Sequence, residues 1–405
     1  MSETIEVHLE IDGGTRQVGV CRYVSKRGRS ASSVFEYDPS WLDDPAAFAI
    51  DPTNLPVQRG PFATGNEQSG LPGAIRDGVP DRWGQRLIER AFRKANETRT
   101  LTEIDYLLAI NDATRVGALR YRREGATEFD ERVGEYKVPP MIQLPALLNA
   151  ADAVHGNTET AEDLKLLLNQ GSPLGGARPK SVVQDNQGDL AIAKFPKPDD
   201  DRSIAHGEVL ALTLAKAAGI NAAEAQVESV VGKPVSLIKR FDRRGGTRVP
   251  FLSAMSLLNA NDGEEAAYTE IADAIRINCA HPTEDLHELW RRIVFSVMIG
   301  NLDDHLRNHG FLRLEEGWVL SPAYDLNPVP AEERAREMTT WISEEGPQAD
   351  VQLALNACEF FALSSSEAQA ILDEVASVVQ TWREVAQQIG MSGPDQRTYS
   401  SSFIT

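Results

Sequence analysis

The stretch between residues 300 and 326 is the part of the sequence richest in side chains that can bind metal ions or exchange protons. These side chains are Asp303, Asp304, His305, Asn308 and Asp325. Phosphoryl transfer in a protein kinase uses one Asp to accept the proton of the attacking hydroxyl, a downstream Asn to bind Mg²⁺, and a further Asp to hold the metal on the phosphates. The interval from Asp303 to Asn308 matches the D-x-x-x-x-N spacing of that catalytic loop. The same residues are also typical of a polar loop in which Asp and Asn cap turns and helix ends.

The flanking elements are predicted to bring these groups together. The apolar run Ile293–Ile299 reads as the end of a helix that breaks at Gly300. Two short strands, Phe311–Leu314 and Trp318–Leu320, form a hairpin that delivers Asp325 towards the loop. Hard oxygen ligands of this kind suit Mg²⁺, which takes only one or two protein carboxylates.

A second set of candidate residues lies in the middle of the chain. The glycine-containing stretch 170–180 precedes two predicted strands, 181–184 and 189–195, and Lys194 lies near the end of the second. The predicted helix 204–219 places Glu208 in its early turns. A Lys–Glu pair of this kind holds the α- and β-phosphates in kinases. The alternative is an edge-strand lysine and a helix glutamate that both face water.

The remaining patterns predict an α+β protein with a β-rich N-terminal lobe and an all-helical C-terminal lobe. Short strands are expected between residues 5 and 57, a helix starts at Asp81, and further helices cover 142–154 and 158–168. Strands are expected at 225–231 and 235–243, and helices at 264–278, 285–299 and 365–389. We expect three parts: a β-rich subdomain (1–130), a nucleotide-binding part (140–249) and a helical catalytic lobe (250–405). A cleft is expected where Lys194 faces Asp303 and Asp325.

The composition limits the classes of function. The chain has 405 residues and a formal net charge of −19, which opposes avid unaided binding to DNA or RNA. Its three cysteines are scattered, so neither a disulfide framework nor a cysteine-rich metal site is indicated. Without a signal peptide pattern or a long apolar run, a cytoplasmic protein without a membrane span is expected.

Several motifs, taken in order, resemble the HipA family, the serine/threonine-kinase toxins of bacterial toxin–antitoxin systems. They are L-P-G-A-I-R-D-G-V-P-D-R-W-G, R-V-G-A-L-R-Y, L-G-G-A-R-P-K, I-A-K-F-P, I-K-R-F-D-R, N-L-D-D-H-L-R-N-H and L-S-P-A-Y-D-L. Together they extend over nearly the whole chain. The resemblance implies a two-lobed protein-kinase-like fold that uses ATP and Mg²⁺.

The resemblance also implies roles for individual residues. Asp303 would be the catalytic base, Asn308 and Asp325 would hold Mg²⁺, and Lys194 would contact the nucleotide phosphates with Glu208 as its partner. The other nucleotide-binding residues implied are Gly175, Gly176, Ala177, Arg178, Lys180, Lys239, Arg240, Phe241, His305 and Tyr324.

The sequence departs from the family at one regulatory position. Family members often carry a serine in the glycine loop that becomes autophosphorylated and silences the kinase. Here the aligned residue is Pro173, and Ser172 precedes it. Ser172 is therefore the candidate autophosphorylation site, and Pro173 restricts it to extended geometry.

The expected function is transfer of the ATP γ-phosphoryl group to a protein Ser or Thr. The family suggests a translation component such as an aminoacyl-tRNA synthetase as the target, and neutralisation by a small DNA-binding antitoxin that links the complex to DNA. The alternatives are a non-catalytic co-repressor that only binds the antitoxin, and a kinase for a non-protein hydroxyl. The sequence does not identify the target, the antitoxin or the oligomeric state.

Overall fold

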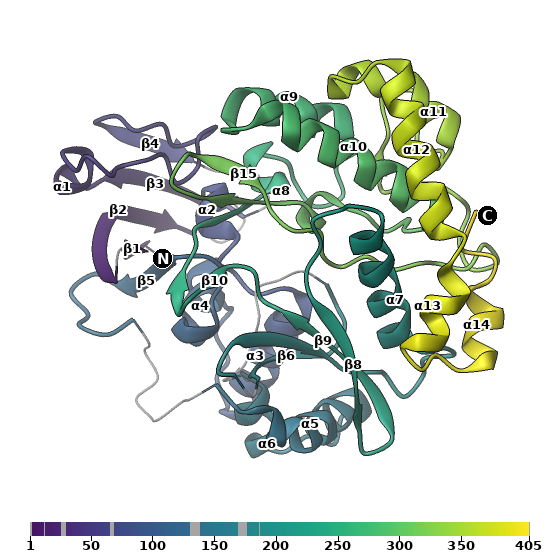
Figure 1. Ribbon diagram of the computed structural model, residues 1–405. Helices are drawn as coiled ribbons and strands as arrows, with labels where there is room; N and C mark the ends of the chain where they lie inside the picture. Colours follow the sequence, from purple (N-terminus) through teal and green to yellow (C-terminus); the bar gives the residue numbers. More distant parts are fainter. Residues whose placement is uncertain are drawn as a thin grey trace. The chain divides into compact units, whose positions relative to one another are not determined.

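The computed structural model describes residues 2–11, 13–25, 30–64, 69–129, 138–168, 176–185 and 187–404. The chain forms two compact units, and each is built from two separate stretches of sequence. Unit 1 is Met1–Lys197 with Asp242–Asp262, and unit 2 is Pro198–Phe241 with Gly263–Thr405. Figure 1 shows the elements of both units.

Unit 1 contains an antiparallel sheet of five strands in the order β4-β3-β2-β1-β5. The strands are β1 (Ser2–Ile11), β2 (Gly14–Val24), β3 (Ser32–Tyr37), β4 (Pro61–Thr64) and β5 (Leu119–Arg123). Alternate residues such as Ile5, Val7 and Leu9 are fully buried, as expected for a sheet with one face on the core.

The other elements of unit 1 are mostly helices and short hairpins. They are α1 (Pro39–Leu42), α2 (Gly73–Arg76), α3 (Arg82–Lys94), α4 (Glu103–Leu108), α5 (Leu144–Gly156), α6 (Ala161–Leu168), β6 (Lys180–Gln184), β7 (Leu190–Lys194), β10 (Arg243–Arg244), β11 (Thr247–Arg248), β12 (Phe251–Ser253) and α8 (Ala254–Leu257). The predicted start of α3 is confirmed, because the Asp81 carboxylate accepts a hydrogen bond from the backbone N–H of Gly84 and caps the helix. Strands β6 and β7 pair as an antiparallel hairpin, as predicted.

Unit 2 is dominated by helices. Its elements are α7 (Ile204–Ala217), β8 (Ala225–Val230), β9 (Lys233–Lys239), β13 (Ala266–Ala267), α9 (Tyr268–Asn278), α10 (Pro282–Ile299), β14 (Gly310–Arg313), β15 (Trp318–Leu320), β16 (Thr340–Trp341), α11 (Val351–Asn356), α12 (Ser365–Val379), α13 (Trp382–Gln388) and α14 (Gly393–Tyr399). Helix α10 is the centre of this unit: it is apolar through its second half and packs against α9, α11 and α12 (Figure 1). Its burial gives the following loop a rigid support.

The prediction of an α+β fold is confirmed, but the prediction of an all-helical C-terminal lobe is wrong. Strands β14 and β15 pair antiparallel, which confirms the hairpin predicted over residues 311–320, and β13 and β16 pair in parallel. The second pair is two residues long, which is too short to leave a period-2 pattern in the sequence. The predicted helix 365–389 is also divided into α12 and α13, with a break at Gln380 and Thr381.

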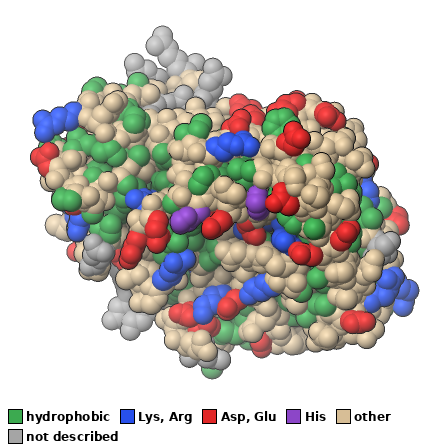
Figure 2. Space-filling view, turned by 45° about the horizontal axis from the view of Figure 1, so that its top comes forward, with side chains coloured by type: hydrophobic (Ala, Val, Ile, Leu, Met, Phe, Trp, Pro, Cys, Tyr) green, Lys and Arg blue, Asp and Glu red, His purple; other side chains and the backbone are tan. Residues whose placement is uncertain are grey.

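The division predicted from sequence into residues 1–130, 140–249 and 250–405 stays a prediction. Among the described residues, no helix combines the length and apolarity that crossing a bilayer requires. On the face shown in Figure 2, acidic and basic side chains are interspersed among polar and apolar ones.

Candidate active site

The end of helix α10 sets the direction of the loop that carries the candidate catalytic residues. Gly300 adopts a left-handed conformation with φ of 68° and ends the helix. A Cβ at this position would lie 2.8 Å from the carbonyl oxygen of Ser402 and 3.1 Å from that of Val329. Glycine is therefore required both by its backbone conformation and by the close approach of two other segments.

Two segments of unit 2, residues 300–310 and 321–329, lie against each other. Hydrogen bonds that join them include Val329 N to Gly300 O (2.9 Å), Asn327 N to Asn301 Oδ1 (2.9 Å), Tyr324 Oη to Arg307 O (2.5 Å) and Ser321 N to Gly310 O (2.8 Å). Residue numbers rise along one segment as they fall along the other, so the two run antiparallel. Asp325 lies between the second and third of these bonds, and Asn308 lies between the third and fourth. The structure thus brings together the two segments that carry the predicted metal ligands.

Asp303 is the most accessible of the candidate catalytic residues. Its side chain is 69% exposed, and Oδ1 lies 3.3 Å from a guanidinium nitrogen of Arg334. Thr339 Oγ1 is 3.4 Å from the same oxygen and also bonds to Arg334 (3.0 Å). A carboxylate that is accessible and held from one side can accept a proton from an approaching hydroxyl.

Asn308 faces inward at the end of the short 3₁₀ turn Leu306–Asn308, and only 5% of its surface is exposed. Its amide nitrogen donates to the backbone oxygen of Asp303 (3.2 Å), which fixes the orientation of the side chain. Its oxygen Oδ1 is buried and has no hydrogen-bond partner within the described parts of the chain. A buried amide oxygen without a partner is costly, and a cation is one group that can satisfy it.

Asp325 is half-buried and has a φ of 57°, in the left-handed region that Asp tolerates better than most residues. Its Oδ1 accepts a hydrogen bond from Asn327 Nδ2 (3.1 Å), and the same amide donates to the Asp325 carbonyl (3.0 Å). The amide of Asn327 therefore orients this carboxylate. No group of three or more His, Cys, Asp or Glu residues forms a metal site within the ranges described. Asn308 and Asp325 instead offer the small set of oxygen donors that a Mg²⁺ ion bound mainly to phosphates requires.

Aromatic residues lie beside this pair of segments. The rings of Tyr324 and Phe241 are 5.4 Å apart between centroids. Phe241 follows strand β9, whose last residue, Lys239, is half-buried, while Arg240 is buried. His305 is also half-buried, and its Nδ1 has no hydrogen-bond partner within the described ranges.

A buried polar cluster beneath the loop was not anticipated from the sequence. Asp304, with 2% of its surface exposed, accepts a hydrogen bond from the hydroxyl of Tyr268 and lies 3.2 Å from Nε2 of His309. Burial alone would raise the pKa of the Asp304 carboxyl, but the neighbouring His309 and the Tyr268 hydroxyl lower it below its ordinary value. Tyr268 is 36 residues away in sequence, so no local motif could have revealed the cluster. It anchors the loop between Asp303 and Asn308.

The predicted residues of unit 1 lie around hairpin β6–β7. Lys194 is half-buried at the end of β7, and Gly176, with φ of 109°, precedes β6 together with Ala177 and Arg178. Lys180 is buried, and its ammonium lies 2.7 Å from the carboxylate of Asp81. This ion pair favours a structural role for Lys180. Gly175 and the proposed phosphorylation site Ser172, with Pro173, lie outside the described residues.

Glu208 belongs to unit 2. It is buried on helix α7 with 1% of its surface exposed, and it accepts a hydrogen bond from Ser236 Oγ (3.2 Å). A buried carboxylate of this kind is stabilised by polar partners. Its predicted pairing with Lys194, which lies in unit 1, stays a prediction.

Two family models match this chain. The HipA-like C-terminal domain matches residues 172–382, and the HipA N-terminal domain matches residues 13–122. The chain belongs to the HipA family. Both segments of the candidate site lie within the HipA-like C-terminal domain.

The chain is also similar to individual proteins. It is 23% identical over 319 residues to Y4mE of Sinorhizobium fredii, covering 72% of this chain and 71% of that protein. It is 28% identical over 162 residues to Y4dM of the same bacterium, covering 36% and 39%. Both are named as inferred kinases. Among solved structures, the chain is similar to HipA of Shewanella oneidensis, which was solved in complex with HipB and operator DNA. The TM-score is 0.70 at 14% sequence identity, and the match covers 98% of this chain and 94% of that chain. This likeness confirms the fold.

Proposed function

We propose that this member of the HipA family is an ATP- and Mg²⁺-dependent serine/threonine protein kinase with a two-lobed kinase fold. The observation that carries the proposal is the pairing of segments 300–310 and 321–329, with the unpartnered Oδ1 of Asn308 and the oriented carboxylate of Asp325. Two relatives named as inferred kinases add support.

In this proposal each residue has one task. Asp303 accepts the proton of the attacking Ser or Thr hydroxyl, and Asn308 and Asp325 hold Mg²⁺. The metal, when bound, offsets the charge that develops on the phosphates. Tyr324 and Phe241 supply an aromatic surface close to these residues. Lys194 contacts the nucleotide phosphates and is assisted by Glu208, and Gly176, Ala177 and Arg178 contribute to the phosphate-side loop, as family membership implies.

We further propose that the protein acts as the toxin of a toxin–antitoxin pair. The solved relative forms a complex with HipB and operator DNA. By analogy, a small DNA-binding antitoxin is the partner here, and it provides the contact with DNA that a chain of net charge −19 does not favour by itself. The proposed target class is a translation component such as an aminoacyl-tRNA synthetase, in the cytoplasm.

The test is phosphorylation of cell proteins by the purified chain. The protein is incubated with γ-labelled ATP, Mg²⁺ and a bacterial lysate, and labelled residues are identified by mass spectrometry. The proposal predicts phosphoserine or phosphothreonine on a small number of lysate proteins. Label that appears only in lipid or small molecules would reject the protein-kinase assignment, and absence of any Mg²⁺-dependent label would favour a purely antitoxin-binding role.

A further inference from the structure

Helix α3 carries an unusual concentration of positive charge for so acidic a protein. Its sequence R-W-G-Q-R-L-I-E-R-A-F-R-K contains five basic residues and one acidic residue. Arg82, Arg86 and Arg90 follow one another at intervals of four, so they share one helix face. Like charges at this spacing destabilise an isolated helix, and basic residues in the first turn oppose the helix dipole. Helix stability alone therefore does not explain this pattern.

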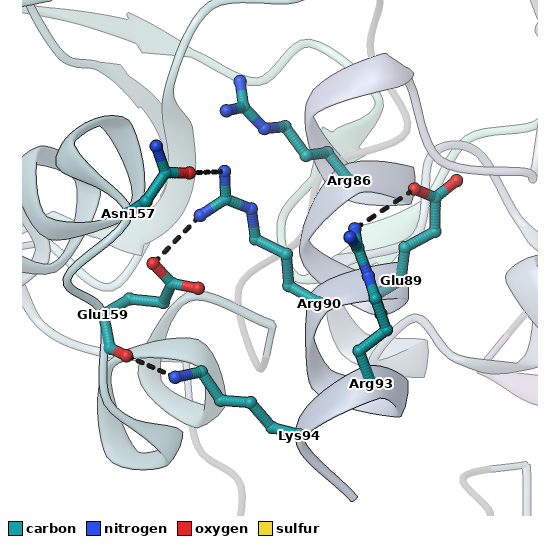
Figure 3. Close-up of a pocket in the computed structure, with 7 residues that line it drawn as sticks. All are labelled: Arg86, Glu89, Arg90, Arg93, Lys94, Asn157 and Glu159. Atoms are coloured by element: carbon teal, nitrogen blue, oxygen red, sulfur yellow. Dashed lines mark hydrogen bonds and ion pairs between the residues drawn. The ribbon is translucent and has the colours of Figure 1, made fainter. Parts of the chain in front are cut away.

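Residues Arg86–Lys94 of α3 form one wall of a pocket of about 470 Å³ (Figure 3). The opposite wall comes from the end of α5 and the following turn. The lining residues are Arg86, Glu89, Arg90, Arg93, Lys94, Asn157 and Glu159. All belong to unit 1, and they include none of the residues of the candidate active site.

Arg90 is held rigidly within this pocket. Its guanidinium donates to Glu159 Oε2 (2.9 Å), to Asn157 Oδ1 (2.6 Å) and to the carbonyl oxygen of Val154 (3.0 Å), and its side chain is only 11% exposed. Lys94 Nζ donates to the backbone oxygen of Glu159 (2.6 Å). These bonds hold the two walls together and immobilise the side chains of Arg90 and Lys94 before any ligand binds. An incoming anion therefore pays little conformational entropy to order these two side chains.

Arg86 differs from Arg90 because no hydrogen bond or ion pair joins it to any residue in the described ranges, and no dashed line reaches it in Figure 3. Its five N–H donors are available in a planar arrangement that matches phosphate oxygens. Arg93 lies 3.9 Å from Glu89, a long and exposed contact that is worth little. Four cationic residues face two carboxylates, which leaves the pocket with a net charge of +2.

We propose that this pocket binds a small polyphosphate anion, in which Arg86 and Arg93 hold the phosphates above the fixed guanidinium of Arg90. The basic residues of this pocket are confined to part of one helix, which suits a compact diphosphate group better than a duplex backbone, because a duplex requires an extended basic track. The proposal is independent of the kinase assignment, because it uses other residues.

Titration calorimetry with inorganic pyrophosphate tests the proposal. Excess EDTA is included to suppress metal-dependent binding at the candidate active site. Three proteins are compared: the unmodified chain, Arg86→Gln and Arg82→Gln. Arg82→Gln removes the same charge from the same helix, but Arg82 does not line the pocket. Circular dichroism establishes that all three proteins are folded.

Pyrophosphate is expected to bind the unmodified chain and Arg82→Gln equally, and to bind Arg86→Gln about tenfold more weakly, since one charge-assisted contact is lost. Binding that is absent, or equal in Arg86→Gln and the unmodified chain, overturns the proposal. So does sulfate that binds as tightly as pyrophosphate at equal ionic strength, because the site then lacks a preference for polyphosphate. If a duplex oligonucleotide binds in an Arg86-dependent way and pyrophosphate does not bind, the proposal of a small polyphosphate ligand is wrong and the pocket is a nucleic-acid contact.

Discussion

Asn308 is the residue whose surroundings are most informative about the chemistry of this protein. Its amide nitrogen is occupied by the Asp303 carbonyl, while its buried oxygen has no partner in the described ranges. Asp325, on the facing segment, is oriented by Asn327. The motifs predicted that the segments carrying Asn308 and Asp325 would meet. They did not predict that Asn301, Arg307 and Tyr324 join these segments, because the contacts cross 17 to 26 residues of sequence.

Asp325→Asn is expected to weaken Mg²⁺-dependent binding of ATP at least tenfold, because the metal loses a charged oxygen ligand. Fluorescence titration with an ATP analogue, with and without Mg²⁺, measures the effect. Asp373→Asn, which changes an exposed acid on α12, serves as the charge-matched control. Equal Mg²⁺ dependence in Asp325→Asn and the unmodified chain would show that Asp325 does not hold the metal.

Arg334 is expected to position the carboxylate of Asp303, the proposed catalytic base. Arg334→Gln removes the cation 3.3 Å from Asp303, and we expect kcat to fall by up to about fivefold with little change in the KM for ATP, since an exposed ion pair contributes at most roughly 1 kcal/mol. Steady-state kinetics measure both constants, and Arg334→Lys should restore part of kcat. Lys216→Gln, an exposed change on α7, is the control. A rise in KM with unchanged kcat would instead assign Arg334 to nucleotide binding.

At the scale of elements, the helix ends and hairpins that depend on neighbouring residues could be predicted from the sequence. Asp81 was recognised as a helix start because its cap depends on a residue three positions away. The β14–β15 hairpin and the end of α10 at Gly300 were also predicted from nearby residues. The break between α12 and α13 was missed because the apolar periodicity continues through it, whereas tertiary packing decides it: Trp382 is fully buried and stacks on Phe403. The contact of Lys180 with Asp81 could not be read from local sequence either, because the two residues are 99 positions apart, and the role of Lys180 in nucleotide binding stays a prediction.

A buried carboxyl group produces a pH-dependent contribution to the stability of unit 1. Asp51 is fully buried, and burial, which is its largest influence, raises the pKa of this carboxyl to about 6 although Asn54 donates hydrogen bonds to it. The folded state therefore keeps a proton that the unfolded chain releases near pH 4. The stability that this group contributes is present at low pH and is lost as the pH rises through about 6.

Asp51→Asn is expected to remove this component. Between pH 5.5 and 7.5, the unmodified chain should lose roughly 1 kcal/mol more unfolding free energy than the variant does. Urea unfolding at the two pH values measures the difference, and Asp43→Asn, at a largely exposed position, is the control. If the variant and the unmodified chain show the same pH dependence, Asp51 is not the titrating group.

At the scale of the whole molecule, charge is the property that most restricts the partners. The net charge of −19 is obtained directly from the sequence, whereas the local basic pocket on α3 becomes visible only when Asn157 and Glu159 are placed beside the helix. The assignment of unit 1 and unit 2 to interleaved stretches was also not predicted, because the return of Asp242–Asp262 to unit 1 depends on long-range contacts such as the hydrogen bond from Gly117 N to Asp242 Oδ2, 125 residues apart.

The purified chain alone is expected to bind duplex DNA more weakly than about 10⁻⁵ M at 150 mM salt, because its field repels phosphates. Fluorescence anisotropy with a labelled duplex measures this affinity. A Kd below about 10⁻⁶ M, which is tighter than typical non-specific binding, would contradict the proposal that the antitoxin provides the contact with DNA.

The central claim is that Asp303 is the base for phosphoryl transfer, and the Asp303→Asn variant tests it most directly. Single-turnover transfer of labelled phosphate from ATP is measured for this variant and for the unmodified chain, together with ATP affinity. We predict that the rate falls by roughly 10²–10⁴-fold while ATP affinity stays within about twofold, since a general base acts only in the chemical step. Transfer at the unmodified rate by Asp303→Asn would contradict the account.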